Sequence, residues 1–414
     1  MKKFILWLNL VLLTFFPISQ LVAADGFSVP AKHAIAVDFQ SGKVLYEKDA
    51  ATPTHIASIS KLLTVYLVYE AMEQGKFGMN TTVDISDYPY QLTIDAIASN
   101  IDLDTRQYTV QELLQASLIS SANSAAIALA EKVAGSEPKF VDMMTAKLKE
   151  WGITDAKLVN ATGLNNEILG NNIYPGSSST DENTMSAKDI AIVARRLLLD
   201  YPEVTDITSK YSFTLEGNTY YSTNQMIEDG TYQRGGVTGL KTGTTELSGA
   251  SFVATTAENH FQIITVILEA DKGDEFPDNR FVATNALMDY VYNNFTLTTL
   301  VKKGESYADS TVKVFNGTNS ISRAIASKDM TLITRKDKTE AISATFKADK
   351  EVVDAPIKAG HKLGSLTSRD TDLIGSGYLD QLPNVTMIAK NDTSTPTAPV
   401  SWWNHFVRYV NEKL

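Results

Sequence analysis

A serine and a lysine three residues apart open a strongly apolar segment of the chain. Ser58 and Lys61 directly precede the run Leu62–Ala71, which is apolar around its whole circumference and therefore typical of a buried central helix. Side chains at i and i+3 share a helix face, so the Ser58 hydroxyl and the Lys61 amine can meet. Burial and the helix N-terminus both disfavour an ammonium ion and lower the Lys61 pKa. A neutral amine beside a hydroxyl makes that serine an activated nucleophile.

The same spacing occurs twice more, so it is a weak signal by itself. Ser136 to Lys139 is typical of a helix start, because Ser136 suits an N-cap and Pro138 suits the first turn. Ser310 to Lys313 lies in a stretch that alternates like a strand. Two further motifs favour Ser58 and Lys61.

The second motif is a polar junction between two expected helices. A capping-box pattern opens a helix over residues 109–118, and another helix is expected over residues 125–133. Ser121 and Asn123 lie between them. Such a cluster is also typical of an N-cap, and residues 222–224 repeat its Ser-x-Asn spacing. Ser121 and Asn123 therefore indicate a functional site only in combination with the other motifs.

The third motif, Lys241-Thr242-Gly243-Thr244, precedes an expected β-hairpin over residues 249–268. Lys241, Thr242 and Thr244 offer a cation and two hydroxyls to an anion such as a carboxylate. Gly243 in a strand permits close approach of a ligand to the backbone.

The order Ser-x-x-Lys, Ser-x-Asn, Lys-Thr-Gly resembles that of the penicillin-recognising serine enzymes. Within that group the chain is similar to the low-molecular-mass penicillin-binding proteins that are serine-type D-alanyl-D-alanine carboxypeptidases, of the Gram-positive, streptococcal type. The similarity covers about residues 25–390. It includes residues 34–46, 160–164, 185–189 and the pair Gly239-Leu240.

The resemblance implies an α/β (α+β) catalytic domain like that of penicillin-binding proteins and serine β-lactamases, with an antiparallel sheet and a helical subdomain. A small all-β C-terminal domain and an amphipathic tail helix would follow. The substrate would be a peptidoglycan pentapeptide that ends in D-Ala-D-Ala, and β-lactam antibiotics would be covalent inhibitors. The resemblance implies neither a metal nor an organic cofactor.

Three residues would be catalytic by this resemblance. Ser58 would attack the penultimate carbonyl, and Lys61 would accept its proton. Ser121 would pass a proton to the departing D-alanine amine. The backbone N–H groups of Ser58 and Thr244 would form the oxyanion hole.

Five residues would bind the substrate. Asn123 would hold the substrate amide, and Lys241 would add positive potential. Thr242 and Thr244 would bind the terminal carboxylate, with Gly243 between them.

Composition excludes several other classes of function. The chain has 414 residues, no cysteine and a net charge of -11, which excludes disulfides and thiol catalysis and offers no basic patch to nucleic acid. The five histidines, His33, His55, His260, His361 and His405, are scattered singly, which argues against a zinc peptidase. No Gly-x-Ser-x-Gly elbow is present, which argues against an α/β-hydrolase.

The expected organisation has five segments. Residues 1–24 are a secretory signal, with an uncleaved N-terminal anchor as the alternative. Residues 25–295 are the catalytic domain and residues 296–390 an all-β module of alternating segments. Residues 391–399 are a polar linker, and residues 400–414 form an amphipathic helix. We expect this helix on the outer face of the cytoplasmic membrane, with docking on the β-module as the alternative.

Three other functions stay open on the sequence. A class A-like β-lactamase shares the motifs but needs a fast deacylation base, and the long β-module argues against it. A D,D-transpeptidase would use an amine acceptor in place of water. A wall-associated binding module would need all three motifs to be incidental. Penicillin turnover and product analysis with added amino acids separate these functions.

Overall fold

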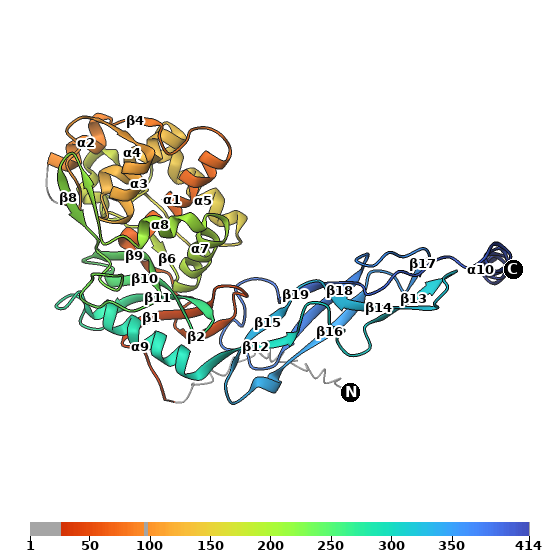
Figure 1. The fold of residues 1–414 in the computed structure, drawn as a ribbon. Coiled ribbons are helices and arrows are strands. Elements are labelled where there is room, and N and C mark those ends of the chain that lie inside the picture. The colour runs from red at the N-terminus through yellow and green to blue at the C-terminus, as the bar shows by residue number, and fades with distance from the viewer. Residues whose placement is uncertain (1–25, 95–97, 414) are drawn as a thin grey trace, which may run out of the picture.

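The computed structural model describes residues 26–94 and 98–413, so the expected signal segment, residues 1–24, lies outside the described residues. A mixed part of sheet and helices is followed by an elongated β-module, and the last helix lies at the far end of that module (Figure 1). The fold class expected from the sequence is confirmed.

A five-stranded antiparallel sheet is the base of the first part, in the order β2-β1-β11-β10-β9. Ile264 and Val266 on β11 face one apolar core, whereas Ile263 and Ile267 face another. Because successive side chains alternate between faces, burial on both faces explains the continuous apolar runs in these strands. The strands are β1 (Ala31–Asp38), β2 (Val44–Lys48), β9 (Val237–Thr245), β10 (Gly249–Glu258) and β11 (Phe261–Ala270).

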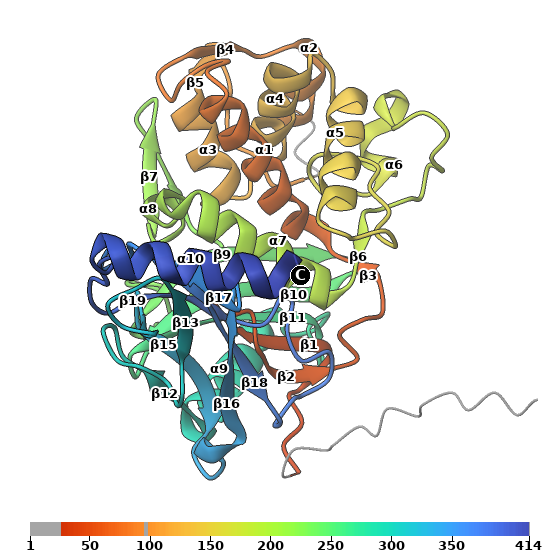
Figure 2. The same cartoon turned by 90° about the vertical axis from the view of Figure 1, so that its right-hand side faces the viewer.

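Helices cover both faces of this sheet (Figures 1 and 2). Helix α9 (Asn279–Asn294) covers one face. The helical subdomain covers the other. Its main helices are α1 (Lys61–Glu73), α2 (Asp87–Ile94), α3 (Val110–Leu118), α4 (Asn123–Ala134), α5 (Glu137–Glu150) and α7 (Ala187–Asp200). Its shorter elements are α6 (Asn166–Leu169), α8 (Thr205–Thr208), β3 (Thr54–His55), β4 (Thr82–Asp84), β5 (Gln107–Thr109), β6 (Thr184–Met185), β7 (Ser212–Leu215) and β8 (Asn218–Tyr221).

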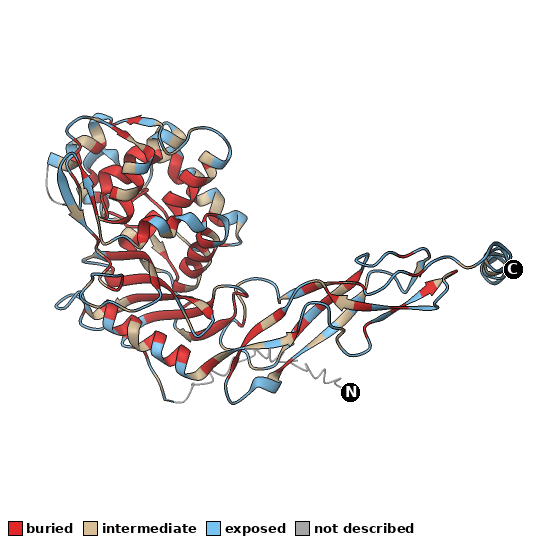
Figure 3. Ribbon diagram, in the orientation of Figure 1, coloured by how far each residue is buried: buried red, intermediate tan, exposed pale blue. Residues whose placement is uncertain are grey.

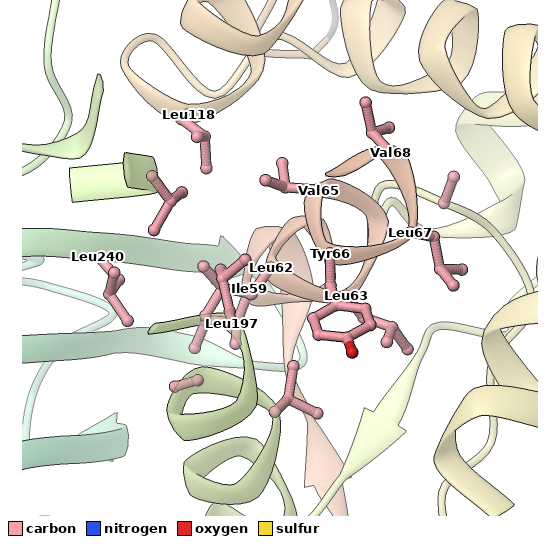
Figure 4. Close-up of a cluster of buried hydrophobic side chains, with 14 of the residues drawn as sticks. Ile59, Leu62, Leu63, Val65, Tyr66, Leu67, Val68, Leu118, Leu197 and Leu240 are labelled. Carbon is pink, nitrogen blue, oxygen red and sulfur yellow. The ribbon is translucent and has the colours of Figure 1, made fainter. Parts of the chain in front are cut away.

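Helix α1 runs through the centre of the helical subdomain, as its apolar circumference predicts. Every residue from Lys61 to Tyr69 is buried. Figure 4 shows Leu118 of α3, Leu197 of α7 and Leu240 of β9 around the start of this helix. Because the core surrounds α1, the side chains at its N-terminal turn are held in fixed positions.

The β-module has one apolar core between a six-stranded and a two-stranded sheet. Alternating burial in β13 and β14 agrees with the alternating sequence pattern. The two-stranded sheet pairs β12 (Phe295–Val301) with β15 (Met330–Arg335). The larger sheet has the order β16 (Ile342–Ala348), β18 (Lys362–Asp370), β19 (Asn384–Ala389), β14 (Ile321–Ala326), β13 (Thr311–Phe315), β17 (Val352–Asp354).

A loop of the β-module returns to the catalytic sheet, which no sequence pattern indicates. The Val44 N–H donates to the Gly377 carbonyl, 2.8 Å away, alongside edge strand β2. Lys43 Nζ lies 2.7 Å from Asp370 Oδ2, and both side chains are almost fully buried. The Tyr378 hydroxyl donates to the same carboxylate at 2.8 Å. The two parts are therefore joined by a buried ion pair as well as by the chain.

The expected polar linker, residues 391–399, differs in the structure. Thr393 is buried and exchanges two backbone hydrogen bonds of 2.8 Å with Ile357. The Ser394 carbonyl accepts from the Thr318 N–H at 2.7 Å. This part of the segment therefore belongs to the β-module. The polar composition that suggested a flexible linker instead supplies side chains for a solvated edge.

The last helix, α10 (Ala398–Lys413), lies across the end of the β-module and is exposed (Figures 2 and 3). Its polar side contacts the module: Asn316 Nδ2 donates to Ser401 Oγ at 2.7 Å, and Arg408 Nη1 lies 2.9 Å from Asp354 Oδ1. The polar side of α10 therefore docks on the β-module, which is the alternative that the sequence left open for this helix. The exposed apolar side includes Trp402, Trp403, Phe406 and Tyr409. Within the described part of the chain, no helix combines the length and hydropathy that crossing a bilayer requires.

Candidate active site

The three motifs meet around one cavity of about 220 Å³. Ser58, Ser121, Thr242 and Thr244 come from three separate elements and all line it. A larger cavity of about 900 Å³ lies between the two parts of the molecule and contains no residue of the three motifs. The chemistry that the sequence predicts therefore belongs to the smaller cavity.

Ser58 lies in a 3-10 turn, η1 (Ala57–Ser60), that leads directly into α1. Lys61 Nζ lies 2.9 Å from Ser58 Oγ. The residue before the serine, Ala57, has a φ of 47°, an uncommon conformation for a residue with a side chain. The turn presents the half-buried Ser58 to the cavity and places Lys61 behind it.

Lys61 is fully buried among oxygen atoms. Its Nζ donates to Asn123 Oδ1 at 2.7 Å and to the Thr162 carbonyl at 3.1 Å. Burial lowers the pKa of Lys61 well below its ordinary value, and the charge of Lys241 lowers it further. Burial was expected as a cause from the sequence, whereas the second lysine was not.

Asn123, which the resemblance expects to hold the substrate amide, contacts Lys61 in the structure. Its Oδ1 accepts from Lys61, and its Nδ2 donates to the Ser99 carbonyl at 2.9 Å. Both ends of this amide are thus used inside the protein. Asn123 begins α4, whereas Ser121 precedes it with a φ of 63° and lines the cavity. The junction therefore turns the serine toward the cavity and the asparagine toward Lys61.

Strand β9 brings the third motif beside Ser58. Thr242 Oγ1 donates to Thr223 Oγ1 at 2.7 Å, and Thr244 is exposed. Lys241 is buried, and its Nζ donates to the Thr242 carbonyl at 3.1 Å. Burial and the nearby Arg280 lower the pKa of Lys241 to about 7.

The structure gives Gly243 a steric reason in addition to the ligand approach that the sequence suggested. A Cβ there would lie 2.7 Å from the Ile56 carbonyl oxygen and 3.1 Å from Ile59 Cγ1. Strand β9 therefore lies so close to the turn that carries Ser58 that a side chain at position 243 would collide with that turn. Gly243 lets the third motif pack directly on the first.

Several cavity residues were missed by the sequence analysis. Arg280, at the start of α9, donates from Nη1 to the Gly243 carbonyl at 2.9 Å. Burial lowers its pKa to about 10, a shift that Asp278 opposes. Its position depends on the packing of α9 against β9 and β10, so no spacing signal could reveal it. The others are Ser99, Thr223, Asp278 and Phe281. Thr223 lies in the repeated Ser-x-Asn pattern, which is the one signal that could have found it.

The loop that contains Gly163 packs on the turn that carries Ser58. A Cβ on Gly163, whose φ is +83°, would lie 1.7 Å from the Ala57 carbonyl oxygen. Asn160 Oδ1 accepts from the Gly163 N–H at 2.6 Å, and Asn183 Nδ2 donates to Ser60 Oγ at 2.9 Å. The loop therefore supports both the serine and the lysine.

Two other kinds of chemistry lack support around this cavity. Within residues 26–94 and 98–413, no cluster of histidine and acidic side chains could hold a metal ion. The chain has a Glu-x-x-x-Asn spacing at Glu167 and Asn171, where a β-lactamase could carry its deacylation base. Both residues are exposed, and neither lines the cavity.

Comparison with known proteins gives the same picture. Residues 19–272 match the family model described as D-alanyl-D-alanine carboxypeptidase, and residues 295–395 match penicillin-binding protein 5, C-terminal domain. The D-alanyl-D-alanine carboxypeptidase DacF of Bacillus subtilis is 30% identical over 373 residues, which cover 87% of this chain and 88% of the relative.

Two solved structures extend this comparison. A peptidoglycan synthesis regulatory factor (PBP3) from Streptococcus pneumoniae is 54% identical with a TM-score of 0.84, and the match covers 88% of this chain and 100% of the other. Penicillin-binding protein D2 from Listeria monocytogenes, solved in an ampicillin-bound form, is 26% identical with a TM-score of 0.54. That match covers 65% of this chain and 100% of the other.

Proposed function

The chain belongs to the D-alanyl-D-alanine carboxypeptidase family and is a serine-type carboxypeptidase of cell-wall metabolism; we propose that Ser58 is its nucleophile. The observation that carries this assignment is the 2.9 Å distance between Lys61 Nζ and Ser58 Oγ, with the amine fully buried. Burial favours the neutral amine, which has a lone pair for the serine proton.

We propose the following reaction, which these positions support. Ser58 Oγ attacks the carbonyl between the last two D-alanines while Lys61 Nζ takes its proton. The oxyanion accepts hydrogen bonds from the backbone N–H groups of Ser58 and Thr244, and loss of one such donor typically costs about 3 to 4 kcal/mol of barrier. Ser121 passes the proton to the departing amine, the C–N bond breaks, and D-alanine leaves. Water then hydrolyses the ester and regenerates Ser58.

The terminal carboxylate of the substrate would bind beside Thr242 and Thr244. Lys241 and Arg280 supply positive charge behind these hydroxyls, although Lys241 itself does not line the cavity. Asn123 contacts Lys61 through Oδ1 and would hold the substrate amide through its Nδ2 group. The same geometry accepts a β-lactam, whose carbonyl and carboxylate would occupy the same positions and leave an ester on Ser58.

The purified exported portion, incubated with a diacetyl-Lys-D-Ala-D-Ala peptide, tests this proposal. Released D-alanine is measured, and a parallel sample is labelled with a fluorescent penicillin and digested for mass spectrometry. We expect D-alanine release and a stable label on Ser58. A label on another residue would remove Ser58 as the nucleophile, whereas rapid loss of the label with penicillin turnover would favour a β-lactamase.

We further propose that residues 1–24 direct export and that α10 holds the protein on the outer membrane surface. The polar side of α10 is bound to the β-module, so its apolar side faces away from the protein. Trp402 and Tyr409 are 67% and 61% exposed on that side. Tryptophan and tyrosine favour the headgroup level of a bilayer, and a helix of this kind lies in the interface.

Sedimentation with liposomes tests the membrane proposal. A chain that ends at Thr397 keeps the paired segment around Thr393 and lacks α10, and we expect it to stay in the supernatant with its peptidase activity unchanged. The double variant Trp402→Ser, Phe406→Ser should behave likewise, whereas the polar-side control Asn404→Ala should still sediment. Equal sedimentation of all forms would refute the proposal.

A further inference from the structure

Glu137 is a buried carboxylate that the reaction above does not use. It begins α5 inside the second Ser-x-x-Lys pattern, Ser136 to Lys139, and is 4% exposed. Among the ion pairs of the described residues, none joins a lysine, arginine or histidine to it. A carboxylate buried without a cation loses hydration energy, so hydrogen bonds from the protein must stabilise it in that position.

Two hydrogen bonds hold the carboxylate, and one comes from the loop beside Lys61. Glu137 Oε1 accepts from the Ala161 N–H at 2.9 Å, and Oε2 accepts from the Tyr88 hydroxyl at 2.9 Å. Burial raises the pKa of Glu137 to about 7, although these two hydrogen bonds lower it. The charge of Glu131 on α4 raises it further.

The same loop residue is bound at its other end by α1. The Ala161 carbonyl accepts from Thr64 Oγ1 at 2.6 Å. The next carbonyl, that of Thr162, accepts from Lys61 Nζ at 3.1 Å. One peptide unit therefore separates the N–H that Glu137 holds from the carbonyl that contacts the lysine. A shift of this loop would move a hydrogen-bond acceptor of the amine that must face Ser58.

We propose that Glu137 is a positioning residue for the acylation step: by holding the Ala161 N–H it fixes the Thr162 carbonyl and thereby the direction of the Lys61 amine. The inference rests on the proposed role of Lys61 as proton acceptor. It assigns a function to a motif that, from its sequence alone, marks a helix start.

Acylation kinetics with a fluorescent penicillin test the role of Glu137 in the full exported chain. Labelling rates over a range of penicillin concentrations separate the noncovalent affinity from the maximal acylation rate. Glu137→Ala should lower the maximal rate by about 10- to 100-fold, the cost of a small misplacement in an active site, and leave the affinity unchanged. Glu137→Gln keeps an oxygen for the Ala161 N–H and should retain most of the parental rate. Glu131→Gln, which changes the neighbouring acid that does not contact the loop, is the matched control.

Endpoint labelling gives the folded fraction, so a stability defect is separated from a slower rate. If the alanine variant does not fold, Glu137→Asp keeps the charge but withdraws it from the Ala161 N–H, and it should also acylate slowly. A parental rate in the Asp or Ala variant would overturn the inference, as would a Gln variant as slow as the Ala variant. Lys61→Arg that acylates at the parental rate would instead overturn the assignment of Lys61 itself.

Discussion

At the scale of the residue, the site contains two buried lysines, Lys61 and Lys241, whose pKa values are both lowered. Lys61 must be neutral to take a proton, and its pKa lies well below the ordinary range because the side chain is buried and Lys241 is close. In the proposed reaction Lys241 attracts the substrate carboxylate as a cation, yet burial and Arg280 lower its pKa to about 7. The positive charge that helps neutralise Lys61 is therefore itself easily lost as the pH rises.

A pH dependence follows from the Lys241 pKa of about 7. Below that pH Lys241 is protonated and attracts the carboxylate, whereas above it the charge disappears. The kcat/KM for a D-Ala-D-Ala peptide, which reports groups of the free enzyme, should therefore fall as pH rises above 7. Lys241→Arg keeps its charge, so its alkaline fall should move to higher pH. An unchanged alkaline limb in that variant would assign the fall to another group.

The sequence predicts the residues of this site better than their contacts. The types and spacing of Ser58 and Lys61 predict their contact, because both lie in one local element, whereas Ser121 joins them only through the packing of α4 against α1. The use of Asn123 by Lys61 and Ser99, and the position of Arg280, depend on how separate elements pack. Such contacts have no signature along the chain.

At the scale of the element, the loop over residues 160–164 packs against the turn that carries Ser58. Its Gly163 has a φ of +83° and lies against the Ala57 carbonyl, so the glycine is required twice, for conformation and for space. Gly152 has nearly the same φ, +81°, but open space around it. Alanine at either position would strain the backbone, but only at position 163 would its Cβ also collide with a neighbouring atom.

Gly163→Ala and Gly152→Ala form a matched pair. The left-handed conformation costs a residue with a Cβ about 1 to 2 kcal/mol, which both variants should lose in unfolding free energy. Gly163→Ala must also displace the carbonyl beside Ser58, so its penicillin acylation should be slower, whereas Gly152→Ala should acylate normally. Urea unfolding and labelling rates measure the two effects. Equal acylation rates would show that the loop does not support the turn.

At the scale of the whole molecule, the β-module is joined to the catalytic part by a buried ion pair. Lys43 Nζ lies 2.7 Å from Asp370 Oδ2 and donates to the Ile333 carbonyl at 3.0 Å. Alternating segments predict the β-module itself, but the two partners of this pair lie in different parts of the sequence. No local pattern could therefore indicate the junction.

Lys43→Met should destabilise the chain by about 3 to 5 kcal/mol, because it leaves the Asp370 carboxylate buried without its cation. The exposed pair Lys362–Asp349 is the control, and Lys362→Met should cost about 1 kcal/mol or less. Urea unfolding followed by fluorescence compares the two variants. A loss no larger for Lys43→Met than for the control would mean that other contacts join the two parts.

The most direct test of the whole account is the variant Ser58→Ala, measured in parallel for D-alanine release and for covalent penicillin labelling. Both reactions need the same ester on Ser58, so both should disappear while the unfolding curve stays close to the parental one. Ser136→Ala and Ser310→Ala, which change the serines of the other two Ser-x-x-Lys patterns, should keep both activities. Covalent labelling of the Ser58→Ala protein at the parental rate would contradict the account.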